Sequence, residues 1–307
     1  MYVNIGGIEQ WLQFGAESAA SPALLFLHGG PGGSSCPAAA AWKPWEMHFT
    51  FVHWDQRGAG RTFGRNEEVG CGSLSIDRMV KDGIEVVEFL RGYLNKKKIV
   101  LMGHSWGSAL GIYMLQQRPD LFSAYVGTGQ LVNKRLNEEV NYERQLVQAR
   151  AAENGDAITA LLEIGPPPFD RERMTILRLW ADKLACNGGD DVQMKPSPLP
   201  ADFTAAEREL IAKGRLYSSE QLFDELSSLD LRRLGLTFKV PIFFFHGTSD
   251  QQTPLVIVEQ YFSEITAPAK QLVRFKDCHH FVVFKRPDDV LTELLDRVHP
   301  FATGAFP

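Results

Sequence analysis

Ser105 lies between two glycines in the segment Gly103-His104-Ser105-Trp106-Gly107, directly after an apolar run and before a helical pattern. A serine hydroxyl is a weak nucleophile unless a base lies within hydrogen-bond reach, and its backbone must leave room for a carbonyl to approach. A sharp strand-to-helix turn exposes the hydroxyl, and glycines on either side relieve the crowding because they lack a Cβ. The pattern predicts Ser105 as the nucleophile of an acyl-transfer reaction, and an ordinary turn is the alternative.

An acid and a base follow other apolar runs further along the chain. Asp250 comes after one predicted strand, and His279-His280 comes after the next. In open α/β sheets ligands bind beyond the carboxyl ends of the strands, so residues at these ends meet in space. Asp250 is the expected acid, although a helix that begins near Pro254 could also use it as a cap. On the residues alone His279 and His280 compete for the role of base, and no third ligand at a recognisable spacing makes this pair a metal site.

A glycine-rich loop, His28-Gly29-Gly30-Pro31-Gly32-Gly33, follows the first long apolar run. A tetrahedral intermediate needs backbone donors, and the N–H of Trp106 is unpaired if Trp106 begins a helix. The second donor is expected at Gly30, where a missing side chain lets the backbone approach the substrate. A phosphate loop is disfavoured, because no Gly-Lys-Ser/Thr follows and Pro31 lacks an N–H. Gly30 and Trp106 are the predicted oxyanion hole.

Short apolar runs alternate with helical patterns over most of the chain. This alternation predicts an α/β fold, in which a mostly parallel central sheet carries helices on both faces. Tyr2 to Phe14 is typical of a hairpin with Gly6-Gly7 at its turn, and the apolar spacing from Ile76 to Leu94 predicts a helix. The runs expected to form the other strands lie at 23–27, 49–54, 99–102, 124–126, 241–245 and 272–275.

The alternation stops after about residue 131 and resumes near Lys239. The segment between is helical and charged, and two proline-rich stretches, at 165–168 and 195–200, interrupt it. A helical segment between two strands predicts an inserted cap over one end of the sheet. The expected division is a first core part at 1–131, a helical cap insert at 132–236 and a second core part at 237–307.

Composition narrows the class of protein. The chain has 307 residues with 44% hydrophobic and 22% charged residues, and its net charge of −5 gives no sign of a nucleic-acid surface. No apolar run approaches the roughly 18 residues of a membrane span, and the N-terminal residues lack the pattern of a signal peptide, so a cytoplasmic protein is expected. The cysteines have no metal-ligand spacing and are expected to be free thiols, namely Cys36, Cys71, Cys186 and Cys278. No metal or organic cofactor is expected, and the oligomeric state stays open.

Five segments carry a resemblance to a known family: FLHGGPGGSS, HWDQRGAGRT, GHSWGS, HGTSDQQTP and DCHHFVVFKRPDDV. Together they resemble the α/β-hydrolase fold and, within it, the proline iminopeptidase-like serine hydrolases, over nearly all of the chain except its middle. The resemblance implies that His280 is the base, since it lies seven residues before Pro287 as the base of the family does. His279 then takes the place of a usual glycine. The chain order Ser105, Asp250, His280 matches this fold.

The resemblance implies an exopeptidase that releases an N-terminal proline or another small residue. Peptidases of the family hold the free amine of the substrate with glutamates of the cap, often beside a WxxWE-like motif, and the segment 132–236 lacks that motif. An esterase or amidase on small carbonyl compounds is therefore the alternative, and a non-catalytic binding module is a remote third. The expected partner is a small peptide or a small carbonyl compound, without nucleic acid or membrane. The acidic residues of the middle segment that could bind an amine are Glu138, Glu139, Glu143, Glu163, Asp170 and Glu172.

Overall fold

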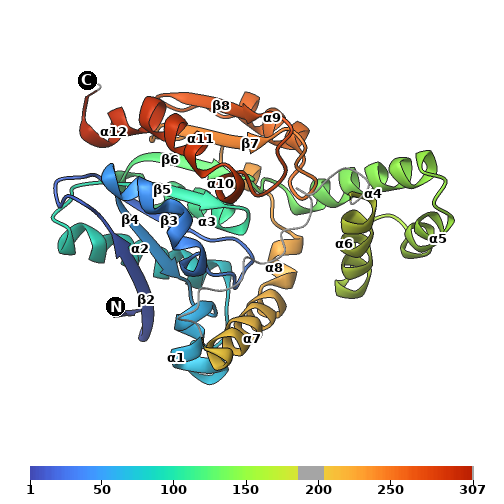
Figure 1. The fold of residues 1–307 in the computed structure, drawn as a ribbon, viewed down its shortest axis with the longest axis horizontal. Coiled ribbons are helices and arrows are strands. Elements are labelled where there is room, and N and C mark those ends of the chain that lie inside the picture. The colour runs from blue at the N-terminus through green and yellow to red at the C-terminus, as the bar shows by residue number, and fades with distance from the viewer. Residues whose placement is uncertain (186–203, 306–307) are drawn as a thin grey trace.

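An eight-stranded sheet forms the centre of the computed structural model, which describes residues 1–185 and 204–305 (Figure 1). The strand order is β1-β2-β4-β3-β5-β6-β7-β8. The pairs β1–β2 and β2–β4 are antiparallel, and every pair from β4 to β8 is parallel, so the prediction of a mostly parallel α/β sheet is confirmed. The bounds are β1 (Tyr2–Ile5), β2 (Ile8–Gly15), β3 (Ala23–Leu27), β4 (Thr50–Asp55), β5 (Ile99–His104), β6 (Phe122–Thr128), β7 (Ile242–Gly247) and β8 (Lys270–Phe275).

Helices cover both faces of this sheet, as the unbroken apolar runs predict. In β3, Leu25 and Leu27 pack into one hydrophobic cluster, while Leu24 and Phe26 pack into the cluster on the other face. The first cluster includes side chains of α2 (Ile76–Tyr93), α3 (Trp106–Gln117) and α9 (Leu255–Glu264), and the second includes those of η1 (Cys36–Met47), α10 (Val282–Lys285), α11 (Pro287–Glu293) and η5 (Leu294–Val298). The remaining elements of the two core parts are α1 (Gly60–Cys71), η2 (Pro119–Leu121) and α12 (His299–Thr303).

The described residues between β6 and β7 form helices and no named strand, as predicted. The chain leaves the sheet after β6, and α4 to α6 project from one side, where they enclose a separate small apolar cluster (Figure 1). The predicted break at 165–168 lies between α5 and α6, whereas the break at 195–200 lies outside the described residues. The division into core and cap domains stays a prediction. The helices are α4 (Lys134–Ala151), α5 (Gly155–Ile164), α6 (Arg171–Ala185), α7 (Ala205–Gln221), α8 (Phe223–Ser227) and η4 (Leu231–Leu234).

Helix α7 returns to the core and packs on the loops that follow β3 and β4. The Ser218 hydroxyl donates to the carbonyl of Gly58 at 2.8 Å. A Cβ added to Gly214 would lie 2.8 Å from the same carbonyl oxygen, and one added to Gly32 would lie 2.8 Å from Arg215 Cα. The backbone of α7 therefore packs directly on the backbone of both loops.

The predictions of free cysteines and of no membrane span can be compared with the described residues. Cys36, Cys71 and Cys278 are buried thiols that form no disulfide with one another, and Cys186 lies outside the described residues. Within the described ranges no helix has the length and apolar character needed to cross a membrane. The cytoplasmic location stays a prediction.

Candidate functional site

Ser105 occupies a sharp corner between β5 and α3. Its backbone has φ 54° and ψ −119°, a conformation that residues with a side chain rarely adopt. A Cβ added to Gly103 would lie 2.3 Å from the carbonyl oxygen of Gly107, and one added to Gly107 would lie 2.1 Å from that of Leu27. Both glycines are therefore needed for the close packing of the corner, as their spacing in the sequence predicts.

Asp250 and His280 form a buried pair beyond the ends of β7 and β8. His280 Nδ1 lies 2.8 Å from Asp250 Oδ2, and the two residues are only 3% and 1% exposed. The Thr253 hydroxyl donates to the same carboxylate oxygen at 2.8 Å, and the backbone N–H groups of Gln252 and Thr253 donate to Oδ1. Asp250 does not cap the following helix, whose N-cap is Pro254.

The environment of Asp250 keeps its carboxylate ionised. Burial by itself raises the pKa of Asp250, but the charge of His280 and the hydrogen bonds from His280 and Thr253, helped by nearby His246, bring the pKa below its ordinary value. The anion accepts the Nδ1–H of His280, so Nε2 on the other side of the ring carries the lone pair. His280 is thus held in the tautomer that a proton acceptor needs.

The end of β6 brings Ser105 and His280 to the same place. The Ser105 N–H donates to the carbonyl of Thr128 at 3.0 Å. A Cβ added to the next residue, Gly129, would lie 2.8 Å from His280 Nδ1 and Cε1. The ring of His104, which precedes Ser105, lies 4.8 Å from the His280 ring between their centroids. Residues from β5, β7 and β8 thus converge beside one turn.

The glycine-rich loop borders the serine from the opposite direction. A Cβ added to Gly29 would lie 3.1 Å from Ser105 Cβ, so the absence of a side chain at Gly29 lets the loop pack closely on the serine. Trp106 is buried, and its backbone N–H is the first donor of α3. Among the described residues, neither the Trp106 N–H nor the Gly30 N–H donates a hydrogen bond. Both N–H groups are therefore without an acceptor in the described part of the chain.

The other histidines around these residues are engaged with neighbouring groups of the core. His28 contacts the carbonyl of Gly29 through Nδ1 at 2.9 Å, and His246 contacts the carbonyl of Thr253 through Nε2 at 2.8 Å. His104 is buried, and burial together with the charge of His280 lowers its pKa well below the ordinary value. His279 points elsewhere than His280, since its Nδ1 lies 3.0 Å from the carbonyl of Ser249.

Protonation of two buried histidines is expected to weaken the fold at acidic pH. Burial lowers the pKa of His28 to about 4 and that of His53 to about 3, from an ordinary value of 6.5. In the unfolded chain both rings take up protons below pH 6.5, whereas in the folded protein they stay neutral to lower pH. The free energy of unfolding therefore falls as the pH drops from 6.5 toward 4. Over the roughly two pH units from 6.5 to 4.5 each histidine contributes a loss of about 2 to 3 kcal/mol, at roughly 1.4 kcal/mol per pH unit.

Urea unfolding at pH 7 and pH 4.5 measures this loss. The matched variant is His53→Phe, because the ring of His53 packs against Trp42 and Phe51 and a phenyl ring keeps that contact without titrating. We expect the variant to lose about 2 to 3 kcal/mol less stability than the wild type between the two pH values, the share that His53 contributes. Equal unfolding free energies of the wild type at both values would contradict the prediction.

Two side chains at the site were not assigned a role from the sequence. Thr253 bridges Asp250 and His280, with its hydroxyl 2.8 Å from the carboxylate and 3.2 Å from His280 Nδ1. A threonine three residues after the acid is the only signal that could have indicated it. Gln56 contacts both His28 and Trp106 from beyond β4, and no local pattern indicates that contact.

The letters of the WxxWE motif do occur in the chain, at 42–46, but outside the cap. They lie in η1, where Trp42 and Trp45 are fully buried against the sheet and the Trp42 indole donates to the carbonyl of Val283 at 2.9 Å. Glu46 pairs with Lys43. These tryptophans belong to the core, so the motif does not supply an amine site in the middle segment.

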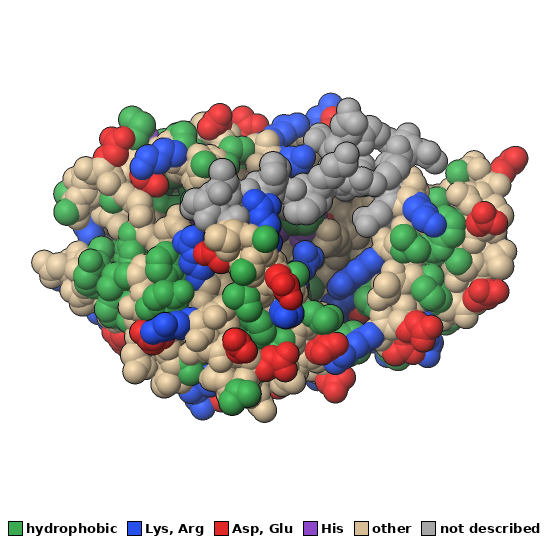
Figure 2. All heavy atoms as spheres, turned by 60° about the horizontal axis from the view of Figure 1, so that its bottom comes forward, with side chains coloured by type: hydrophobic (Ala, Val, Ile, Leu, Met, Phe, Trp, Pro, Cys, Tyr) green, Lys and Arg blue, Asp and Glu red, His purple; other side chains and the backbone are tan. Residues whose placement is uncertain are grey.

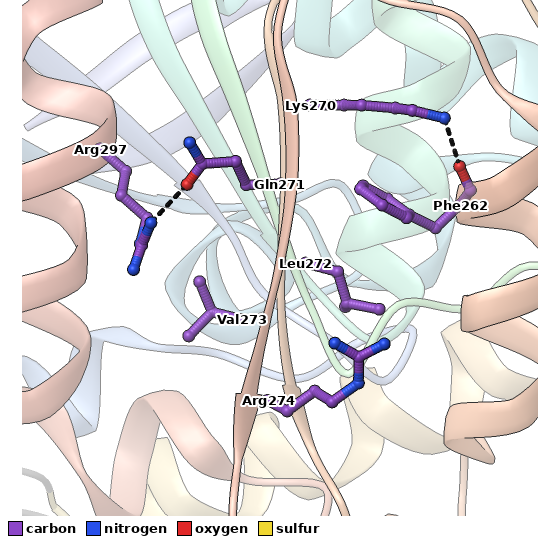
Figure 3. Close-up of a pocket in the computed structure, with 7 residues that line it drawn as sticks. All are labelled: Phe262, Lys270, Gln271, Leu272, Val273, Arg274 and Arg297. Carbon is purple, nitrogen blue, oxygen red and sulfur yellow. Dashed lines mark hydrogen bonds between the residues drawn. The ribbon is translucent and has the colours of Figure 1, made fainter.

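Two cavities found in the structure lie away from these residues. The larger, about 530 Å³, lies along the outer strand β8, and Figure 3 shows Gln271 and Val273 on one side of the strand and Lys270, Leu272 and Arg274 on the other. Its charged side chains already have partners, such as Arg297 with Gln271 and Lys270 with the carbonyl of Phe262. The smaller, about 360 Å³, is lined by residues such as Phe14, Tyr93 and Leu94. Neither includes a predicted site residue.

One face of the molecule is hollowed between the main body and the lobe of α4 to α6. Figure 2 shows this hollow with Lys and Arg side chains along its walls and Asp and Glu side chains near its rim.

Comparisons with known proteins identify the family of the chain. Residues 22–287 match the family model described as alpha/beta hydrolase fold. A probable aminopeptidase, YbaC of Bacillus subtilis (strain 168), is 31% identical over 295 residues, which are 93% of this chain and 91% of that protein. A proline iminopeptidase of Lactobacillus helveticus (strain DPC 4571) is 25% identical over 311 residues, 95% of each chain. The solved proline iminopeptidase of Mycobacterium smegmatis has a TM-score of 0.67 at 17% identity, covering 100% of this chain and 99% of its own.

Proposed function

Because the chain belongs to the alpha/beta hydrolase family, we propose that it is a serine hydrolase that releases an N-terminal proline or another small residue from short peptides. The observation that carries the proposal is the buried His280–Asp250 hydrogen bond of 2.8 Å beside the Ser105 corner. The choice of an exopeptidase is supported by relatives named aminopeptidase and proline iminopeptidase, which align with more than nine-tenths of the chain.

In the proposed first step the Ser105 hydroxyl oxygen attacks the carbonyl carbon, and its proton passes to His280 Nε2. Nδ1 of His280 donates to Asp250 at 2.8 Å, so Nε2 is the nitrogen that accepts. The electron pair of the carbonyl moves to its oxygen, which the N–H groups of Gly30 and Trp106 then stabilise. Donors of this kind act mainly on the charge that develops in the transition state, and one is worth about 3 kcal/mol in comparable sites.

In the second step the tetrahedral intermediate expels the leaving amine, which takes the proton from His280. The C–N bond breaks, and an ester between the acyl group and Ser105 remains. Water then attacks this ester, gives its proton to His280 and releases the free residue as Ser105 recovers its hydrogen. Asp250, with its lowered pKa, stabilises the imidazolium in both halves of the cycle.

A free N-terminal amine is largely cationic at pH 7, so a buried one needs an acceptor, and a carboxylate is the strongest. Of the six acids considered in the middle segment, Glu138 is the buried one, and four of the other five are exposed. The residue before it, Asn137, donates to the carbonyl of Gln252 at 3.3 Å, in the loop that carries Asp250. Glu138 therefore stands on the part of α4 that borders the proposed site.

A second candidate function is an esterase or amidase on small carbonyl compounds, and one observation favours it. Glu138 already pairs with Lys134 at 2.6 Å. Burial lowers the pKa of Lys134, while the charge of Glu138 raises it. The pair leaves no uncompensated negative charge at this point of α4, which suits a neutral substrate better than a cationic one.

The deciding experiment compares three substrates on the purified protein: L-proline p-nitroanilide, its N-acetylated form and p-nitrophenyl acetate. We expect the free amine to be preferred, with kcat/KM lower by roughly 10- to 100-fold for the acetylated form, because a charge-assisted hydrogen bond is lost. Equal rates for the free and the blocked anilide, or turnover of the ester alone, would contradict the exopeptidase and favour the second candidate.

A further inference from the structure

Gln56 is a fully buried amide between the two segments that carry the proposed oxyanion donors. Its Nε2–H donates to the carbonyl of His28 at 3.1 Å, at the start of the glycine-rich loop. Its Oε1 accepts the indole N–H of Trp106 at 3.0 Å, at the start of α3. A single side chain from beyond β4 therefore links β3 and α3 at the site.

A backbone hydrogen bond from Gln56 also determines the tautomer of His28, the first residue of the glycine-rich loop. The backbone N–H of Gln56 donates to His28 Nε2 at 3.2 Å, so that nitrogen is the acceptor and the ring proton is on Nδ1. Nδ1 in turn donates to the carbonyl of Gly29 at 2.9 Å. The peptide that leads into Gly30 is thus held through His28 by the same residue that holds Trp106.

The residues on either side of Gln56 anchor the rest of this region. The carboxylate of Asp55 accepts a hydrogen bond from the Ser34 hydroxyl at 2.5 Å. The residue before Gln56 thus holds the residue that follows the glycine-rich loop. Arg57 pairs with the buried Asp82 at 2.6 Å and donates to the carbonyl of Gly6. The backbone on both sides of Gln56 is therefore held in place, and its side chain extends from there to the loop and α3.

We propose that Gln56 is a positioning residue, which sets the distance between the N–H groups of Gly30 and Trp106 and so shapes the oxyanion hole. The proposal rests on the proposed function, since it assumes a tetrahedral intermediate at Ser105. The two donors come from separate segments, the loop after β3 and the start of α3, and Gln56 bonds to both. Because they act on charge that appears only in the transition state, a change in their spacing lowers kcat while KM stays nearly constant.

The test is Gln56→Met, which keeps the length of the side chain but removes both amide bonds. We expect kcat to fall by about 10- to 100-fold with KM changed less than about threefold, as expected for a misplacement of up to about 1 Å at the reacting centre. The substrate is the better of L-proline p-nitroanilide and p-nitrophenyl acetate. Trp106→Phe removes the indole donor but keeps the backbone N–H, so it should show part of the same loss, and the double variant should be no worse than Gln56→Met.

The chain offers a matched control in Gln10, which is also a fully buried glutamine. Its Oε1 accepts the indole N–H of Trp54 at 2.8 Å, and its Nε2–H donates to Asp82. Gln10→Met should lower the midpoint of urea unfolding as Gln56→Met does, yet keep the wild-type kcat. An equal loss of kcat in both variants, or a loss in Gln56→Met confined to KM, would overturn the positioning role.

Two further outcomes separate this inference from the proposed function. If Ser105→Ala abolishes turnover and Gln56→Met keeps kcat within about twofold, the positioning role is wrong and the serine hydrolase stands. If Ser105→Ala retains turnover, the proposed function fails and this inference fails with it. Where Gln56→Met does not fold, Trp106→Phe decides, and a wild-type kcat in that variant overturns the inference.

Discussion

Replacement of Ser105 by alanine is expected to lower kcat by about a millionfold, the loss seen when the nucleophile of a serine hydrolase is removed. The hydroxyl oxygen forms the bond to the acyl group, and the methyl group of alanine has no oxygen with which to form it. The backbone of the variant should stay in place, because alanine keeps the Cβ and the packing of Gly103 and Gly107 against neighbouring carbonyl groups is unchanged. Initial rates with the preferred chromogenic substrate and a circular dichroism spectrum measure the two expectations.

Ser123 provides the matched control for this variant. It lies on β6, and its buried hydroxyl has no hydrogen-bond partner in the described part of the chain. Ser123→Ala removes a serine hydroxyl from the same sheet and should keep the wild-type rate. Residual turnover of a tenth or more in Ser105→Ala, with the control unchanged, would show that another residue is the nucleophile.

Replacement of His280 by alanine is expected to cost about as much as loss of the serine, roughly a millionfold in kcat, because the two residues act as one unit. His279→Ala is the natural control, since the two histidines are adjacent and only His280 contacts Asp250. We expect His279→Ala to keep most of the activity. Asp250→Asn should lower kcat by about 10⁴-fold, because an amide favours the wrong tautomer of the imidazole.

A reversed result would overturn the assignment of the base. If His279→Ala abolished turnover with a normal circular dichroism spectrum while His280→Ala did not, the base would lie at His279, and the buried pair with Asp250 would be structural. A wild-type rate in Asp250→Asn would contradict the role of the acid even if His280 is essential.

Much of the central sheet is predictable from local pattern. Strands buried on both faces give unbroken apolar runs, so the run at 23–27 coincides with β3, and the other runs fall within β4 to β8 or overlap them closely. Ser105 is predictable for a similar reason. A Cβ at position 103 or 107 would lie little more than 2 Å from a backbone oxygen, so both positions require glycine. This requirement is visible in the sequence as the spacing of the two glycines around Ser105.

Contacts between segments that are distant in the sequence cannot be predicted from a local pattern of this kind. Examples are the hydrogen bond between Gln56 and Trp106, the ring contact between His104 and His280, and the Thr253 hydroxyl between Asp250 and His280. These contacts depend on the order of the strands in the sheet. A single polar residue in a loop has many possible partners, and the periodicity of its own segment does not select one. The middle segment shows the same limit, because helical composition predicts helices there without the position at which each helix begins and ends.

Mass spectrometry of the protein during turnover identifies the residue that forms the acyl-enzyme. L-proline p-nitroanilide, or p-nitrophenyl acetate if the anilide is not cleaved, is mixed with the protein, the reaction is quenched in acid, and the digested peptides are searched for the acyl group of the substrate. We expect acylation at one site, Ser105, and we expect no acylation there in Ser105→Ala and very little in His280→Ala. Acylation at a different residue, or full turnover by Ser105→Ala, would contradict this expectation.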